Sequence, residues 1–271
     1  MKLIYRIWKS RINIPRRAFW VFARKIQQYF DLFTVTIEKQ NASFEAVGLN
    51  RKFGERKLNE ILIDNFGKKY DENDGMFSEH LILIASLSAF KNQIKSILEI
   101  GTFDGRTALI LSKLFSESKI ITIDLPSKDE VFEKSYNRNS KVSDFVYNRN
   151  KNISKSNNVE FRETNSLSLA NYDKEKFDLI WIDGAHGYPI VAMDIINSYR
   201  LGNSGAFILI DDIWKEVNSS DKMYKSIGGY ESLKSLHEAK LINNYSLFYK
   251  RLNGSFNFPN EKKYVGFFQK P

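Results

Sequence analysis

Residues 97–107 read ILEIGTFDGRT and decide the fold. An apolar run ends in an acid, two glycines bound a short turn, and a helical pattern follows at 106–115. Glycine permits the tight turn and lets a ligand approach the backbone closely. The stretch therefore predicts a buried strand, a turn and a helix start, with a ligand site beyond the carboxyl end of the strand.

Similar short apolar runs recur along the chain and alternate with helical patterns, including 188–200 and a helix of His80 to Phe90 capped by Ser78. The buried strands that we expect are Ser96–Ile100, Lys119–Ile123, Val159–Arg162, Phe177–Ile182 and Ala206–Ile210. Segments 242–250 and 263–269 add an antiparallel pair at the C-terminal end. The pattern predicts an α/β, Rossmann-like, mainly parallel sheet of seven strands, with helices on both faces.

The chain divides into an N-terminal arm with its connector, residues 1–74, and a domain at 75–271. We expect 35–75 to be a helical or irregular connector and the polar stretch 126–158 to be a long loop or lid. Together with the arm and 213–240, that loop is expected to determine substrate specificity, since long loops commonly carry it.

The net charge of +9 belongs to the arm rather than to the body. Residues 1–30 contain eight Lys and Arg and no acid, which leaves 33 basic against 32 acidic residues elsewhere. Aromatic and aliphatic side chains alternate with these basic residues, and the uninterrupted apolar runs are too short to cross a bilayer. One interpretation is a basic helical extension that lies on a membrane surface or another polyanion. The other is a helix packed on the body or on a second copy of the chain, as in a homo-oligomer.

The chain has no cysteine, which excludes disulfides, thiolate metal sites and cysteine nucleophiles. This is compatible with a cytoplasmic protein, associated with a membrane if the arm binds one. The turn at 101–105 is G-x-x-x-G, unlike dinucleotide or P-loop fingerprints, so phosphate cofactors are disfavoured.

Acids end several of the predicted strands. Glu99 suits a cationic amine, and Asp124, about 20 residues after the turn, is placed to accept both hydroxyls of a ribose. Asp183, Asp211 and Asp212 end two further strands, and such carboxylates repel one another unless they share a cation or a proton. Their oxygens suit Mg²⁺. The alternative is that all five are ordinary loop and helix-cap acids.

His186 follows the strand that ends at Asp183. Its ordinary pKa near 6.5 makes it available as a base, and a structural hydrogen bond is the alternative. His80 and His237 are expected to be structural.

The order and spacing of LEIGTFDGRT, IDGAHGY and ILIDD resemble the class I S-adenosylmethionine-dependent methyltransferases, and within them the family-24-type methyltransferase domain. The resemblance covers about 75–269. The cofactor residues that it implies are Glu99 and Gly101 at the methionine part, Asp124 at the ribose, and Asn165 and Ser166 at the adenine, with Thr102, Phe103, Gly105 and Asp183 beside them. The sequence departs from the family at Phe103, where glycine is common, and at Asn165, where an acid is common.

The resemblance also implies a metal site, a reaction and an acceptor. Asp183, Asp211 and Asp212 match the ligands of metal-dependent members, and Asp183 and His186 are the catalytic candidates. The expected reaction is O-methylation of a small-molecule or sugar hydroxyl, assisted by Mg²⁺. Two alternatives stay open: a non-catalytic cofactor-binding protein tethered by its arm, and an RNA ribose methyltransferase.

Overall fold

The protein is represented by a computed structural model that describes residue 26 and residues 36–72, 77–134, 142–217, 225–252 and 262–271. The expected helical arm of residues 1–30 lies outside these segments, apart from Ile26. In the described part of the chain, no helix combines the length and the apolarity that a membrane span requires.

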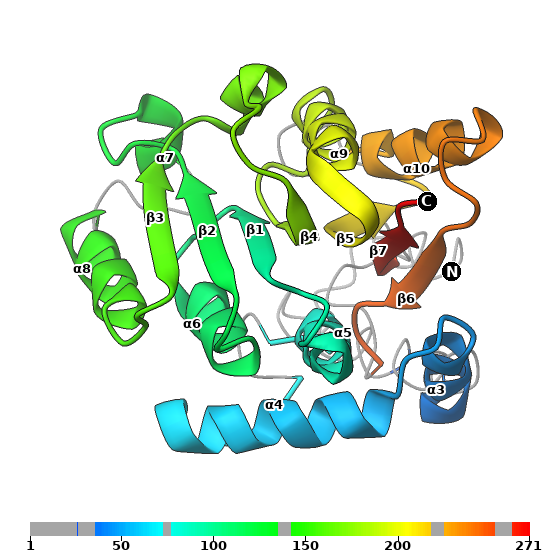
Figure 1. Cartoon of the computed structure of the whole chain (residues 1–271), viewed down its shortest axis with the longest axis horizontal. Coiled ribbons are helices and arrows are strands. Elements are labelled where there is room, and N and C mark those ends of the chain that lie inside the picture. The colour runs from blue at the N-terminus through cyan, green and yellow to red at the C-terminus, as the bar shows by residue number, and fades with distance from the viewer. Residues whose placement is uncertain (1–25, 27–35, 73–76, 135–141, 218–224, 253–261) are drawn as a thin grey trace, which may run out of the picture.

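The seven-stranded sheet has the order β3-β2-β1-β4-β5-β7-β6 (Figure 1). The first five strands pair in parallel, and β7 pairs antiparallel with both β5 and β6, which confirms the predicted architecture. The strands are β1 Ser96–Ile100, β2 Lys119–Asp124, β3 Val159–Glu163, β4 Phe177–Ile182, β5 Gly202–Trp214, β6 Ser246–Tyr249 and β7 Lys263–Gln269.

Helices cover both faces of the sheet (Figure 1). Their bounds are α3 Ile37–Glu45, α4 Arg51–Phe66, α5 Glu79–Leu87, α6 Arg106–Leu114, α7 Glu130–Lys134, α8 Val142–Ile153, α9 Ile190–Leu201 and α10 Gly228–Glu238, with short 3-10 helices η1 Ser88–Phe90 and η3 Ser166–Asn171. The expectation of a loop at 126–158 was wrong, because α7 and α8 lie within it. An amphipathic pattern was hidden there by the high content of Asn, Ser and Lys.

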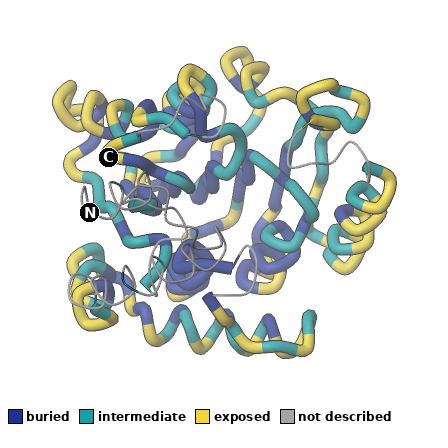
Figure 2. Tube along the Cα trace, turned by 180° about the vertical axis from the view of Figure 1, so that it is seen from behind, coloured by how far each residue is buried: buried dark blue, intermediate teal, exposed yellow. Residues whose placement is uncertain are grey.

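Alternate strand residues point to opposite faces of the sheet and fill two separate cores. Because both faces are buried, the strand sequences are continuous apolar runs. Ile97 and Ile120 face the core under α5 and α6. Leu98 and Ile121 face the core under α9. Burial is concentrated in the strands and in α5, while the outer faces of the peripheral helices are exposed (Figure 2).

Residues 36–72 are packed onto the same body as the sheet. Phe44 and Leu58 are fully buried in the core that contains α5 and β1. Arg51 reaches across to α5, where its Nε and Nη2 donate to the two carboxylate oxygens of Glu79 at 2.7 and 2.5 Å. Both side chains are almost completely buried, so this ion pair fixes the connector to the helix that precedes β1.

We expect Arg51→Met to lower the free energy of unfolding by about 3–5 kcal/mol, because it leaves the Glu79 carboxylate buried without its counter-ion. The measurement is urea unfolding followed by circular dichroism. Arg56→Met is the matched control, since Arg56 lies on the same helix and its ion pair with Glu60 is exposed. Equal stability of the two variants would contradict a role for the buried pair.

Candidate active site

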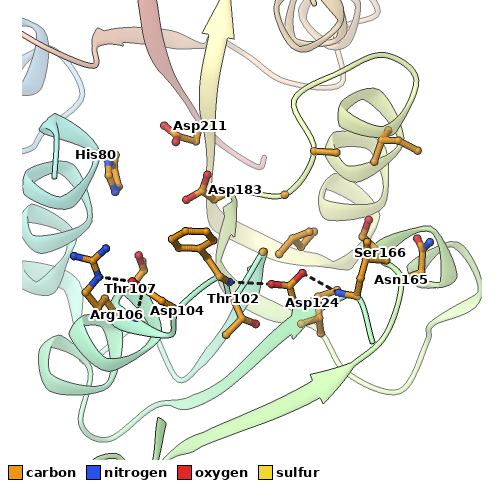
Figure 3. A pocket seen from close by; sticks show the side chains of 18 of the residues that line it. His80, Thr102, Asp104, Arg106, Thr107, Asp124, Asn165, Ser166, Asp183 and Asp211 are labelled. Atoms are coloured by element: carbon orange, nitrogen blue, oxygen red, sulfur yellow. Dashed lines mark hydrogen bonds and ion pairs between the residues drawn. The ribbon is translucent and has the colours of Figure 1, made fainter. Parts of the chain in front are cut away.

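A cavity of about 340 Å³ opens at the carboxyl ends of β1, β2 and β4. Its walls come from the turn after β1, the ends of β2 and β4, η3 and α5 (Figure 3). This is the edge at which the strand order reverses, between β1 and β4, where open α/β sheets bind ligands. The predicted ligand edge therefore contains a real cavity.

Gly101 makes this edge compact. Its φ is +100°, and a Cβ there would lie 2.1 Å from the carbonyl oxygen of Asp183. The residue thus permits the close approach of two strand ends rather than of a ligand. Phe103 has φ +49°, the left-handed region that favours glycine, which explains why glycine is common at its position in the family. Its ring packs edge-on against Phe145 of α8, with ring centroids 4.8 Å apart.

Asp124 lies in the cavity wall at the end of β2. Its Oδ2 accepts from the Phe103 N–H at 2.9 Å and its Oδ1 from the Leu125 N–H at 2.8 Å. Two backbone donors therefore fix the carboxylate beside the turn. Asn165 and Ser166, at the start of η3, line the same end of the cavity (Figure 3). Thr102 and Gly101 line it as well.

Glu99 is fully buried and is not among the cavity-lining residues, unlike what the sequence led us to expect. Its side chain points to the α5–α6 face of the sheet, where the Thr122 hydroxyl donates to Oε2 at 2.5 Å. Thr122 in turn contacts the Thr102 hydroxyl at 2.7 Å, so a chain of hydrogen bonds joins Glu99 to the cavity wall. Burial raises the pKa of Glu99 to about 8, which keeps it neutral at physiological pH.

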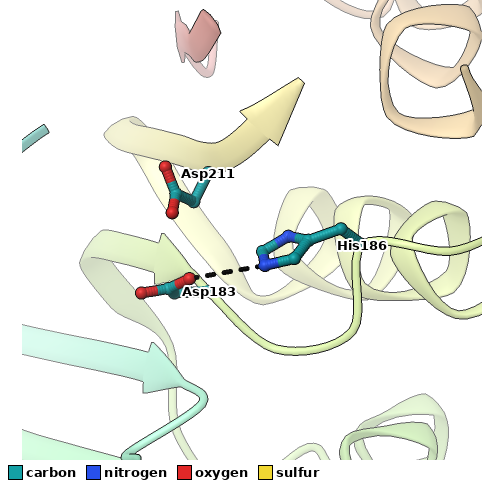
Figure 4. Close-up of side chains that lie close together, drawn as sticks. All are labelled: Asp183, His186 and Asp211. Atoms are coloured by element: carbon teal, nitrogen blue, oxygen red, sulfur yellow. Dashed lines mark ion pairs between the residues drawn. The ribbon is translucent and has the colours of Figure 1, made fainter. Parts of the chain in front are cut away.

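At the other end of the cavity, Asp183, His186 and Asp211 place ligand atoms within 4.8 Å of one another (Figure 4). Burial, followed by the charge of Asp211, raises the pKa of Asp183 well above its ordinary value. Burial lowers the pKa of His186, so its imidazole is neutral. His186 Nε2 lies 3.6 Å from Asp183 Oδ1, but His186 itself is not part of the cavity wall, whereas Asp183 and Asp211 are.

Lys250, which follows β6, supplies the cation that the converging carboxylates need. Its Nζ donates to Asp211 Oδ2 at 2.5 Å and also to Asp212 Oδ1. Burial disfavours the charge of Lys250, but Asp211 and Asp212 outweigh that effect and raise its pKa, so the ammonium is retained. Burial likewise favours the neutral acid at Asp211, yet the Lys250 charge leaves the pKa of Asp211 lowered.

The expected set of three aspartates therefore needs correction. Asp212 sits in an irregular part of β5 with φ +48°, and it is not among the residues of the cavity wall. Its other oxygen accepts from Lys263 at 2.5 Å. With both oxygens of Asp212 held by lysines and Lys250 on Asp211, these residues do not fit an Mg²⁺ ion held by Asp183, Asp211 and Asp212.

Two residues of this cluster were not predicted. His80 of α5 lines the cavity, stacks on Trp181 at 5.2 Å, and contacts Ser78 Oγ through Nδ1 at 2.6 Å. Burial lowers its pKa to about 4. A lysine directly after the apolar run of 247–249 was the available signal for Lys250, since a charge ending a buried strand needs a partner.

We expect Glu99→Gln to flatten the dependence of stability on pH. In the wild type the folded state holds a proton on Glu99 between its ordinary pKa of 4.5 and about 8. The unfolded state releases that proton, so the free energy of unfolding falls as the pH rises through this window. The contribution is on the order of 5 kcal/mol, because the pKa differs by about 3.5 units and one unit corresponds to about 1.4 kcal/mol.

Urea unfolding of both proteins at pH values from 5 to 8.5 measures how steeply the free energy of unfolding changes with pH. A constant difference in stability between the two proteins does not affect this slope. Glu45→Gln is the control, because Glu45 is exposed on α3, and it should keep the wild-type slope. Parallel curves for wild type and Glu99→Gln would contradict a neutral buried Glu99.

The chain is similar to several solved structures, each at a TM-score below 0.5. The O-methyltransferase TomG from Streptomyces achromogenes, involved in tomaymycin synthesis and solved with SAM, is 15% identical over 95% of this chain and 100% of its own, with a TM-score of 0.49. An O-methyltransferase from Bacillus cereus in complex with SAH is 18% identical over 87% and 100%, with a TM-score of 0.49. The N-methyltransferase NodS from Bradyrhizobium japonicum is 13% identical over 70% and 93%, with a TM-score of 0.44. No curated protein matches the chain significantly.

Residues 98–213, a little under half of the chain, match the family model described as a methyltransferase domain. The matched segment contains the turn after β1, the end of β2, and the ends of β4 and β5 that carry Asp183 and Asp211. This segment therefore matches the methyltransferase domain family that its motifs resemble.

Proposed function

We propose that the protein transfers a methyl group from S-adenosylmethionine to a hydroxyl of a small molecule or a sugar. The observation that carries the proposal is a single cavity with Asp124 at one end and the Asp183–Asp211 cluster at the other (Figure 3). An acid at the end of β2 suits the ribose of the cofactor, and a polar cluster at the end of β4 suits an acceptor that must lose a proton.

The cofactor half of the cavity is formed mainly by backbone turns. Asp124 is held by two backbone N–H groups, so its carboxylate is oriented before a ribose arrives. The Oδ1 atom of Asn165 accepts from the Leu167 N–H at 3.0 Å. The amide nitrogen of Asn165 can therefore donate a hydrogen bond to the cofactor. When bound, the cofactor supplies a methyl group that the acceptor oxygen attacks with a lone pair, while the C–S bond breaks and its electrons stay on sulfur.

The acceptor half has to receive the hydroxyl proton. Asp183 is the group in the cavity wall, and His186 lies behind it at 3.6 Å. We assign to Asp183 the contact with the acceptor hydroxyl and the receipt of its proton. His186 is then a positioning residue, whose neutral imidazole orients Asp183 rather than touching the acceptor.

The charge of the cavity wall limits the acceptor. Among the described residues, the wall contains five aspartates, Asp104, Asp124, Asp129, Asp183 and Asp211, against the two fully basic residues Arg106 and Lys250. A polyanion such as RNA is repelled by such a surface, because nucleic-acid binding depends on neutralising phosphates. A neutral hydroxyl compound is therefore favoured over RNA ribose.

Calorimetry with S-adenosylhomocysteine tests the cofactor site. We expect Asp124→Asn to weaken binding by about 10- to 100-fold, because charged hydrogen bonds to the ribose contribute roughly 1.5–3 kcal/mol. Asp178→Asn is the matched control, since Asp178 also accepts from backbone N–H groups but lies outside the cavity wall. A wild-type protein that does not bind this compound would refute the proposal.

Release of S-adenosylhomocysteine in the presence of phenols, saccharides and RNA tests the reaction. We expect Asp183→Asn to lower kcat by about 100-fold or more, the range for loss of a general base, with cofactor affinity kept within about threefold. His186→Gln should have a smaller effect on kcat.

Three outcomes contradict the assignment. Cofactor binding without transfer to any acceptor indicates the non-catalytic alternative, and transfer to RNA alone indicates the ribose alternative. Full activity of Asp183→Asn shows that another group receives the proton.

A further inference from the structure

Lys250 occupies the position between carboxylates where a divalent ion was expected. Its Nζ contacts Asp211 and Asp212, and its charge also acts on Asp183. The Lys250 and Asp211 side chains are 9% and 4% exposed. An ion pair this deeply buried cannot be replaced by solvent, so the ammonium is a fixed part of the site.

The backbone of Lys250 is held from two sides. Its carbonyl accepts from the Glu79 N–H at the start of α5, at 3.0 Å, and its own N–H donates to the Lys263 carbonyl at 3.1 Å. The side chain therefore leaves a rigid point where β6, β7 and α5 meet. These two backbone hydrogen bonds give the Lys250 ammonium a defined position, like that of a bound metal ion.

A lysine ammonium has three N–H donors and no acceptor. Within the described part of the chain, Nζ uses two of them, on Asp211 and Asp212. Lys250 also contributes to the cavity wall. The third N–H is thus available to an oxygen that enters the cavity beside Asp183 and Asp211.

We propose that the Lys250 ammonium is the resident cation of this site, in place of a divalent ion, and that it donates its third N–H to the oxygen of the methyl acceptor. The second half of this inference rests on the proposed function. The first half depends only on the geometry of the carboxylates and the lysine.

The arrangement suits an oxygen nucleophile as the acceptor. A donor-only cation stabilises the negative charge that develops on a hydroxyl as its proton leaves for Asp183. Lys250 therefore combines the two effects that a metal would supply, orientation and charge stabilisation, without an exchangeable ligand.

Mn²⁺ titration, followed by the electron paramagnetic resonance signal of the free ion, tests the first half without any acceptor. In the presence of S-adenosylhomocysteine, we expect Lys250→Gln to bind Mn²⁺ at least about tenfold more tightly than the wild type, because a cation no longer opposes the ion at Asp183 and Asp211. Lys263→Gln is the matched control, since Lys263 contacts Asp212 but not the cavity, and it should bind Mn²⁺ as the wild type does.

A wild-type protein that binds one Mn²⁺ tightly, and loses it on Asp211→Asn, overturns the proposal. Equal Mn²⁺ binding by wild type and Lys250→Gln overturns it as well. If Lys250→Gln does not fold, the double variant Lys250→Gln/Asp212→Asn removes one charge of each sign, and the same gain is expected of it.

The second half is tested once an acceptor is found. Wild-type turnover should be unchanged by EDTA, and Lys250→Gln should lower kcat by about 10- to 100-fold while the KM for the cofactor stays within about threefold. Turnover that requires a metal, or a Lys250→Gln variant with wild-type kcat, refutes it. A protein that neither binds the cofactor nor transfers methyl refutes the proposed function alone, since the Mn²⁺ comparison stands without it.

Discussion

The close contact between the turn after β1 and the end of β4 is the constraint on which the site depends. A side chain at Gly101 would meet the Asp183 carbonyl, so only glycine lets these two strand ends come together. The contact brings Asp183 to the same cavity as Asp124, which is held by the backbone of Phe103. A larger residue at 101 would separate the end of the cavity that contains Asp124 from the end that contains Asp183.

Burial of carboxyl groups at this edge raises a second problem, and the protein solves it in two different ways. Burial raises the pKa of Glu99, which holds a proton, and it also raises the pKa of Asp183, which makes that carboxylate a stronger base. Asp211 and Asp212 instead keep their charge, because Lys250 is buried with them. Glu99 is therefore neutral, and Asp211 and Asp212 are paired, as the cost of an isolated buried charge requires. The sequence indicated that converging carboxylates need a cation or a proton. In the structure, the cation beside Asp211 and Asp212 is the side chain of Lys250.

The sheet and the cavity edge could be predicted because they follow from local patterns. Apolar runs that end in an acid gave the strands, and parallel strands place their carboxyl ends at one edge. The direction of individual side chains could not be predicted in the same way. Glu99 lies one residue from the strand end and faces the α5–α6 core. Asp212 lies in an irregular part of β5 and is not part of the cavity wall, and no local pattern reveals this. The sequence showed that Phe103 replaces a glycine that is common in the family. Only the structure shows that this position has a positive φ, which favours glycine.

The two halves of the cavity also differ in where their residues come from. The end of the cavity that contains Asp124 is formed largely by residues within 98–213, the segment that matches the methyltransferase domain family. At the end that contains Asp183, His80 comes from α5 and Lys250 from the end of β6, both outside that segment. Those two elements are joined by the hydrogen bond from Glu79 to Lys250, and Arg51 of the connector holds Glu79 from the other side. The packing of residues 36–72 is thus linked to His80 and Lys250, the two residues of this end of the cavity that the family match does not cover.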